Sequence, residues 1–262
     1  MSDTTPFNPA ADPGPNAEPE SLVILTGAGI SAASGVPTFR SNGGLWKNRR
    51  FEELATPEAF VAEPNLVWDF YRWRQDGVRK AQPNAGHRAL ARLETILGDQ
   101  LVLVTQNVDD LHERGGSTAP IHMHGEIMKG RCTACAAVLP ELDFHKATET
   151  PCPDCGRLGS LRPHIVWFGE MPFHMDRITQ AVQRATLFLA IGTSGHVYPA
   201  AQYVTIARQC GALTGLINLD PAENSGTFHR FLQGSASEML EGLLEGCEDA
   251  GGFFRGLRAQ LG

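Results

Sequence analysis

The sequence predicts an α/β fold, in which a parallel sheet carries helices on both faces and a smaller domain lies beside it. Four apolar runs predict buried strands at 22–25, 101–104, 186–191 and 213–219. Helical periodicity lies between several of these runs, at 84–97, shortly before residue 185, and at 198–210. Buried strands that alternate with helices are typical of parallel sheets. Ligands of such sheets bind beyond the carboxyl ends of the strands, so a ligand cleft is expected there.

The first predicted strand ends in a glycine-rich turn. Residues 27–32 read Gly-Ala-Gly-Ile-Ser-Ala, which fits the pattern that places a pyrophosphate at a helix N-terminus and predicts a Rossmann-like sheet. A dehydrogenase would continue through a helix into a second strand that carries an acidic residue for the ribose. Here Gly35 and Pro37 interrupt the helix, and residues 38–46 have the composition of a loop. The chain therefore begins a dinucleotide-binding unit and then leaves it.

The charge and hydropathy of the chain argue against several classes of function. Its 262 residues include 22 basic and 29 acidic side chains, a net charge of −7, and no dense run of lysine and arginine, which argues against nucleic acid as a partner. No apolar stretch is long enough to span a bilayer, and the N-terminus lacks the pattern of a signal peptide. We expect a cytoplasmic protein that binds no membrane and is a monomer.

Two segments interrupt the alternation of strands and helices. Residues 41–83 contain a helical pattern after Pro64, and residues 126–162 contain four of the six cysteines. Both are expected to form the smaller domain. Residues 1–20, with five prolines, predict a disordered tail before one folded domain over 21–262. The large, Rossmann-like part of that domain is expected to comprise residues 21–40, 84–125 and 163–255.

The cysteines form two C-x-x-C pairs with the spacing of a four-thiolate zinc site. Cys132 and Cys135 precede Cys152 and Cys155, and 16 residues separate the two pairs. Disulfides or a redox pair are the alternative, and disulfides are disfavoured in a chain without a signal peptide. Two correctly spaced pairs favour one Zn²⁺ ion. Four thiolates leave no open coordination position, so this zinc is expected to be structural.

Several motifs, taken in their order along the chain, make residues 21–250 resemble the sirtuin family of NAD-dependent protein lysine deacylases. They are GAGISAASGVPTFR, TQNVDDLH, HGE at 124–126, the two C-x-x-C pairs, LRPHIVWFGE, GTSGHVYPAA and NLDP. The resemblance implies that NAD is a co-substrate whose nicotinamide–ribose bond is cleaved, without hydride transfer. In the family, the segment after the glycine turn is a loop that closes over NAD. This accounts for Gly35 and Pro37, which let the chain leave the helix.

The resemblance also assigns roles to individual residues. His124 matches the general base that acts on the ribose hydroxyls, and histidine suits this task because its free pKa lies near neutrality. Asn107 matches a second catalytic residue, and with Gln106 and Asp109 it matches the ribose and nicotinamide pocket; a capped turn before a helix is the alternative for this loop. The residues that match the family's contacts to NAD are Gly27, Ala28, Gly29, Ile30, Ser31, Thr38, Phe39, Arg40, Trp46, Gln106, Asn107, Asp109, Gly192, Thr193, Ser194, Asn218, Leu219, Asp220 and Ala236.

One motif matches the segment on which sirtuins lay the substrate peptide as an added strand. Its residues are Val166, Trp167, Phe168 and Gly169. An apolar run with two aromatic side chains is also typical of a hydrophobic core. The agreement of the neighbouring motifs favours the peptide-binding interpretation.

A further match concerns the acyl group. Tyr71 and Arg74 are three residues apart in a predicted helix and therefore share one face. Class III sirtuins carry Tyr-x-x-Arg in this region, with an alanine 16 positions earlier that enlarges the pocket, and Ala55 stands at that position. Arginine can hold a carboxylate through two parallel hydrogen bonds, and tyrosine adds a third. An exposed amphipathic helix is the alternative.

The resemblance therefore implies removal of acyl groups from protein lysines, with nicotinamide, the free lysine and 2'-O-acyl-ADP-ribose as products. Succinyl, malonyl and glutaryl groups are expected to be favoured, and acetyl is expected to be accepted. A protein mono-ADP-ribosyltransferase and a non-catalytic zinc-ribbon module are the alternatives. The presence of His124 favours deacylation over the first, and the acidic charge balance disfavours the second.

Overall fold

The computed structural model describes residues 20–38 and 45–262. Residues 1–19 of the expected tail, and the predicted NAD contacts Phe39 and Arg40, lie outside the described residues. No helix of the described part is long and apolar enough to cross a membrane.

A six-stranded parallel sheet forms the centre of the molecule, in the order β11-β10-β9-β1-β4-β5. Its strands are β1 (Leu22–Thr26), β4 (Leu101–Thr105), β5 (Ile121–His122), β9 (Leu187–Ile191), β10 (Leu213–Asn218) and β11 (Arg230–Gln233). The predicted parallel sheet is confirmed, and the four apolar runs that predicted it form its four inner strands. The two edge strands were not predicted from the sequence.

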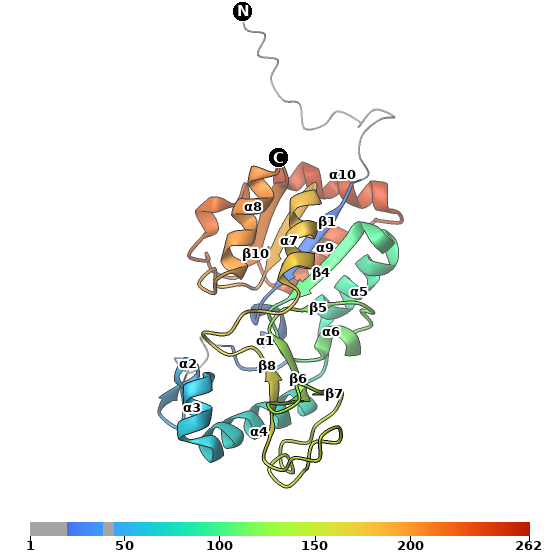
Figure 1. Ribbon diagram of the computed structural model, residues 1–262. Coiled ribbons are helices and arrows are strands. Elements are labelled where there is room, and N and C mark those ends of the chain that lie inside the picture. The colour runs from blue at the N-terminus through green and yellow to red at the C-terminus, as the bar shows by residue number, and fades with distance from the viewer. Residues whose placement is uncertain (1–19, 39–44) are drawn as a thin grey trace, which may run out of the picture.

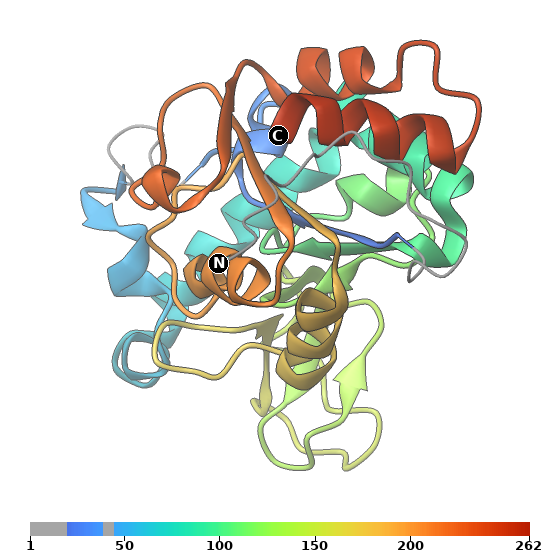
Figure 2. The same ribbon diagram turned by 90° about the horizontal axis from the view of Figure 1, so that it is seen from above.

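Helices cover both faces of this sheet, as Figure 1 and Figure 2 show. They are α5 (Ala85–Leu97), α9 (Ala236–Leu244) and α10 (Ala250–Leu261) on one face, and α7 (Met175–Arg184) and α8 (Tyr203–Gln209) on the other. Leu22 and Ile24 of β1 pack into the first cluster of side chains, and Val23 and Leu25 pack into the second. Successive side chains of a strand point to opposite faces, so a strand covered on both sides reads as an unbroken apolar run.

The predicted helices agree with the structure except near 198–210. The prediction at 84–97 corresponds to α5, which Asn84 caps at its N-terminus. The stretch before residue 185 is α7. At 198–210, a short 3₁₀ turn precedes α8, so the regular helix begins only at Tyr203. The remaining short helices are α1 (Gly29–Ala32), α6 (Leu111–Arg114) and the 3₁₀ turns Gly98–Gln100, Ala200–Gln202 and Ser225–Thr227.

The two segments that interrupt the alternation lie together beside the sheet (Figure 1). Their elements are β2 (Leu45–Trp46), β3 (Arg49–Arg50), α2 (Phe51–Leu54), α3 (Pro57–Ala62), α4 (Pro64–Lys80), β6 (Gly125–Cys132), β7 (Val138–Leu139) and β8 (Leu161–Ile165). Strands β7, β6 and β8 form an antiparallel sheet. One hydrophobic cluster contains Phe70 and Tyr71 of α4 together with Ile127 of β6 and Ile165 of β8. The expected domain boundary at residue 163 falls within β8.

Candidate active site

Two loops at the carboxyl ends of neighbouring strands lie in direct backbone contact. Gly29 N, in the turn after β1, donates to Gly192 O, after β9, at 2.9 Å. A Cβ on Gly29 would lie 2.6 Å from Gly192 Cα, and one on Gly27 would lie 2.7 Å from Gly192 O, so neither position has room for a side chain. α1 follows and has a single turn, after which Gly35 adopts a φ of +81°. The predicted interruption of the helix is therefore confirmed.

The other strand ends bring further predicted NAD contacts to the same edge of the sheet. Asn218, at the end of β10, donates from Nδ2 to Thr193 O at 2.8 Å. Ser194 O accepts from Glu223 N at 3.1 Å. The turn beyond β10 exposes Leu219, at 61%, and also Asp220. The remaining predicted contacts at this edge lie around α1 and α9: Ala28 precedes α1, Ile30 is buried within it, Thr38 is half-buried beyond it, and Ala236 is the first residue of α9.

Trp46 lies apart from these residues, in an aromatic cluster of the smaller domain. Its ring centre is 5.5 Å from that of Phe70 and 6.2 Å from that of Trp73, both on α4. Trp73 also lines a cavity with residues 35–37 of the segment that follows α1. Trp46 therefore packs against Trp73 of α4, which lines that cavity. It does not lie with the other predicted NAD contacts at the strand ends.

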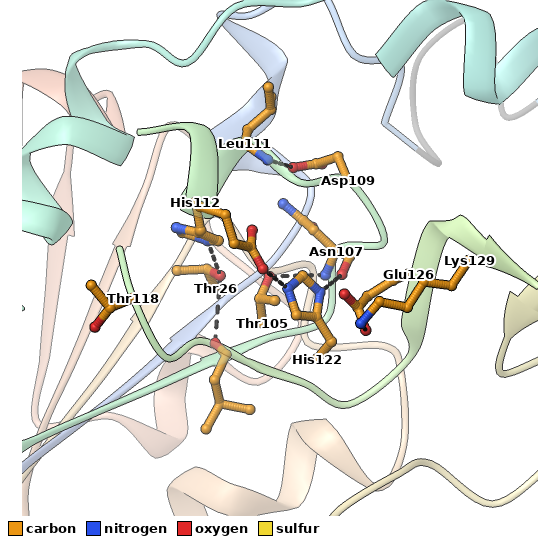
Figure 3. A network of polar contacts seen from close by, with 12 residues as sticks. Thr26, Thr105, Asn107, Asp109, Leu111, His112, Thr118, His122, Glu126 and Lys129 are labelled. Atoms are coloured by element: carbon orange, nitrogen blue, oxygen red, sulfur yellow. Dashed lines mark hydrogen bonds and ion pairs between the residues drawn. The ribbon is translucent and has the colours of Figure 1, made fainter. Parts of the chain in front are cut away.

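The loop that follows β4 is fixed by its own polar side chains (Figure 3). Asn107 N donates to Thr105 Oγ1 at 3.0 Å, and Asn107 Nδ2 donates to Ser31 Oγ at 3.1 Å. Asp109 Oδ1 accepts from Leu111 N at 3.2 Å, at the start of α6. Asn107 and Asp109 are only 6% and 3% exposed, and burial raises the pKa of Asp109. Asp109 thus caps a turn, as the alternative interpretation expected, and the same turn directs Asn107 toward α1.

His124 lies beside this loop, and its hydrogen bond selects one tautomer. Its Nδ1 is 3.0 Å from Gln106 O, and a carbonyl oxygen can only accept, so the proton lies on Nδ1. Gln106 is itself held because its N donates to Thr26 O at 2.9 Å. Burial lowers the pKa of His124 despite this hydrogen bond, so the ring is neutral and Nε2 is unprotonated. A neutral histidine held in one tautomer is suited to act as a general base.

His87, which the sequence analysis did not single out, holds Ser31 in place. Asn84 N donates to His87 Nδ1 at 3.2 Å, so the His87 proton lies on Nε2, 3.3 Å from Ser31 Oγ. Ser31 in turn forms a hydrogen bond with the Asp109 carboxyl group. Burial lowers the pKa of His87 to about 4 and keeps its ring neutral. The Asn84-x-x-His87 spacing at the start of a helix was the signal in the sequence, because it fits a capping box.

α4 carries Tyr71 and Arg74 on the side that faces the interior. Tyr71 is fully buried, Arg74 is partly buried, and the guanidinium carbon lies 5.9 Å from the centre of the Tyr71 ring. Burial raises the pKa of Tyr71 to about 12, so its hydroxyl is protonated at neutral pH. Arg74 also lines a cavity of about 180 Å³ that reaches residues 35–37. The exposed-helix alternative is therefore wrong for this pair, and Ala55 is buried in the same hydrophobic cluster.

The predicted peptide-binding segment has two different sides. Val166 N donates to His124 O at 2.9 Å, which joins the segment to the candidate base. Phe168 is 40% exposed, and Gly169, also exposed, has a φ of +87°. Trp167 is only 2% exposed and donates from Nε1 to Tyr71 Oη at 2.7 Å. The core interpretation is therefore correct for the Trp167 side chain, which points away from any strand added at the surface.

The four predicted zinc ligands are gathered at one place. Cys132 Sγ is 3.8 Å from Cys155 Sγ, Cys135 Sγ is 3.6 Å from Cys152 Sγ, and all four sulfur atoms lie within 4.8 Å of one another. Thiolates about 2.3 Å from a tetrahedral zinc ion are about 3.8 Å apart, so the cluster fits Zn²⁺. All four cysteines are free of disulfides, which removes the disulfide alternative. The ion would tie the end of β6 to the loop before β8.

The comparisons with known proteins agree with this architecture. A family model described as "Sir2 family" matches residues 27–199. A protein of Trypanosoma brucei brucei named an NAD-dependent protein deacylase is 51% identical over 222 residues, which cover 84% of this chain and 91% of that protein. A protein with the same functional name from Escherichia coli K12 is 50% identical over 231 residues, 86% of this chain and 82% of that protein. The crystal structure of a Sir2 homologue in complex with NAD has a TM-score of 0.78 and 44% identity, and the match covers 86% of this chain and 88% of that one. The motifs, the sheet and these matches together show that the chain belongs to the Sir2 family, the sirtuins.

Proposed function

We propose that this protein is an NAD-dependent protein lysine deacylase that favours acyl groups ending in a carboxylate, such as succinyl, malonyl or glutaryl, and also accepts acetyl. Its partners are then proteins with acylated lysines, and its products are nicotinamide, the free lysine and 2'-O-acyl-ADP-ribose. The observation that carries the acyl preference is the cavity that Arg74 shares with residues 35–37. It joins a partly buried cationic side chain to the segment that follows the nucleotide-binding turn.

The catalytic part of the proposal assigns the proton transfer to His124. Bound NAD supplies the ribose carbon that receives the acyl oxygen. The hydrogen bond from Nδ1 to Gln106 O leaves Nε2 of His124 to take a proton from a ribose hydroxyl. Asn107, held by Ser31 and Thr105, is assigned to the nicotinamide-ribose side of the site. The names of the two relatives support NAD-dependent deacylation as the general activity.

The acyl preference follows from the chemistry of Tyr71 and Arg74. A guanidinium can bind both oxygens of a carboxylate, and a protonated phenol can donate to one of them. Acetyl-lysine has no carboxylate and loses these hydrogen bonds. Since each hydrogen bond to a charged group contributes about 1.5–3 kcal/mol, we expect a preference for succinyl of about tenfold or more.

A rate comparison tests this proposal. One peptide sequence carrying succinyl-lysine or acetyl-lysine is assayed with NAD for the wild type, Arg74→Met and Arg79→Met. Arg79 is the matched control, because it lies on the same helix but is exposed and forms a surface ion pair with Asp143. We expect Arg74→Met alone to lose about tenfold or more in kcat/KM on the succinyl peptide and to keep its acetyl activity.

Three outcomes would overturn the proposal. A wild type that removes only acetyl groups would contradict the proposed preference for acidic acyl groups. Labelled protein in place of free O-acyl-ADP-ribose would instead indicate transfer of ADP-ribose. Salt-sensitive binding to DNA with no consumption of NAD would favour the non-catalytic module.

A further inference from the structure

The hydroxyl of Tyr71 lies among groups that can only donate hydrogen bonds. The indole Nε1 of Trp167 donates to Tyr71 Oη at 2.7 Å, and the Arg74 guanidinium carbon lies 5.9 Å from the centre of the Tyr71 ring. Neither an indole N–H nor a guanidinium can accept a hydrogen bond. The indole contact therefore uses a lone pair of the phenolic oxygen. Within residues 20–38 and 45–262, no acceptor is bound to the hydroxyl's own proton, which leaves that proton for an acceptor that a ligand provides.

The indole that donates to Tyr71 is itself held rigidly. The guanidinium carbon of Arg162 lies 3.3 Å from the centre of the Trp167 ring. Arg162 donates to both carboxylate oxygens of Glu170, at 2.7 and 2.9 Å, and Glu170 also accepts from Trp167 N at 2.8 Å. The stacked guanidinium and the carboxylate thus fix the backbone and the ring plane of Trp167 together. The direction of its N–H bond follows from this arrangement.

We propose that Trp167 is a positioning residue that fixes the direction of the Tyr71 hydroxyl beside Arg74, which lines the cavity with residues 35–37, and thereby sets the selectivity for acyl groups that end in a carboxylate. The inference deepens the proposed function and rests on it. Trp167 and Arg74 can only donate hydrogen bonds, so neither can accept the proton of the Tyr71 hydroxyl. A carboxylate oxygen of the acyl group can accept it. An acetyl group ends in a methyl, gains nothing from the oriented proton and does not depend on Trp167.

Trp167→Phe is the first test, because it keeps an aromatic ring and removes the N–H donor. We expect kcat/KM on the succinyl peptide to fall about five- to tenfold, mainly through a higher KM, since the lost contact orients a ground-state interaction. Activity on the acetyl peptide should stay within about twofold of the wild type. Trp68→Phe is the matched control: it shrinks a tryptophan of the same buried cluster, whose ring contacts Phe60 and Phe144.

A double-mutant cycle shows whether Trp167 acts through Tyr71. In the Tyr71→Phe background the hydroxyl is gone, so adding Trp167→Phe should lower succinyl activity no further. A full additional loss in the double mutant would overturn the inference. An equal loss on the succinyl and acetyl peptides would overturn it as well, because it would indicate a purely structural role for Trp167.

Replacement of Trp167 by β-(3-benzothienyl)alanine removes the N–H and keeps the bicyclic shape, which covers the case in which Trp167→Phe does not fold. The same loss of succinyl activity is expected, and unchanged selectivity would overturn the inference. The two proposals fail in different ways. A wild type without succinyl preference overturns both, whereas a preference lost in Arg74→Met but kept in every Trp167 variant overturns only the role of Trp167.

Discussion

The imidazole of His122 lies between two acceptors, the Glu113 carboxylate and the Asn107 carbonyl, and Figure 3 shows His122 beside Asn107. Its Nε2 is 2.6 Å from Glu113 Oε1, and its Nδ1 is 3.3 Å from Asn107 O. Burial lowers the pKa of His122, but the hydrogen bond and charge of Glu113 outweigh burial and leave the pKa raised. The ring therefore donates from both nitrogens as an imidazolium. The His122–Glu113 pair joins β5 to α6 across the loop that holds Asn107. Both ring nitrogens of His122 are therefore engaged, whereas Nε2 of His124 remains available for catalysis.

The charged pair predicts a specific pH dependence of stability. A histidine whose pKa is raised on folding contributes stability that is complete below its unfolded pKa of about 6.5 and is lost as the pH rises through the folded pKa. We expect His122→Gln to lower the free energy of unfolding by about 1 kcal/mol at pH 6, given the partial exposure of Glu113. The difference from the wild type should shrink at pH 9. Urea unfolding at both pH values measures it.

The control for this prediction is His145→Gln, which removes a surface histidine 3.1 Å from Asp76. It should change stability little at either pH. The charged and titratable groups around His122 are Glu113, Asp109, His112, Glu126 and Lys129. His122 itself shifts the pKa of Asp109, His112 and Glu113, so the difference between the two proteins measures His122 together with its effect on these neighbours. A difference for His122→Gln that is constant from pH 6 to pH 9 would contradict the imidazolium assignment.

The contact between Gly29 and Gly192 predicts the cost of adding one methyl group. In Gly29→Ala the new Cβ would meet backbone atoms of Gly192 at 2.6 Å, and backbone cannot move aside as a side-chain end can. We expect a loss of about 1–3 kcal/mol in the free energy of unfolding, together with weaker NAD binding by calorimetry. Gly242→Ala is the control, because it lies in helix α9 with open space around it. It should raise stability by up to about 1 kcal/mol. A Gly29→Ala protein as stable as the wild type would show that the two loops are not packed as described.

The cysteine cluster predicts one tightly bound zinc ion per chain. Elemental analysis of the purified protein should find it, and Cys135→Ser should lose it. Cys210→Ser, which changes an exposed cysteine outside the cluster, should retain it. The long segment between β6 and β8 contains only the two-residue strand β7, so removal of the ion by a chelator should lower the Tm. Full zinc content in Cys135→Ser would contradict the assignment.

The strands that the sequence predicted are those whose burial on both faces leaves an apolar run in the sequence. The four inner strands are covered on both faces and appear as apolar runs, although Thr214 and Gly215 interrupt the run in β10. β5 has two residues and β11 is only partly buried, so neither produces such a run. The sequence places Trp167 in a predicted peptide-binding segment but could not show that its side chain turns inward toward Tyr71. That direction depends on the contact between α4 and the segment after β8, which are 96 residues apart at Tyr71 and Trp167.

His124 gives the most direct test of the catalytic assignment. The base must be unprotonated to work, and burial lowers its pKa, so kcat/KM should hold its neutral value as the pH falls and decline only below about pH 6.5, the pKa of a free histidine. His124→Asn should reduce kcat by about a hundredfold or more while NAD binding and the Tm stay close to those of the wild type. An acid limb above pH 7 would contradict the neutral, half-buried imidazole, because it would require a group whose pKa is raised. His122 is such a group, and disappearance of this limb in His122→Gln would then identify His122 as the group that titrates.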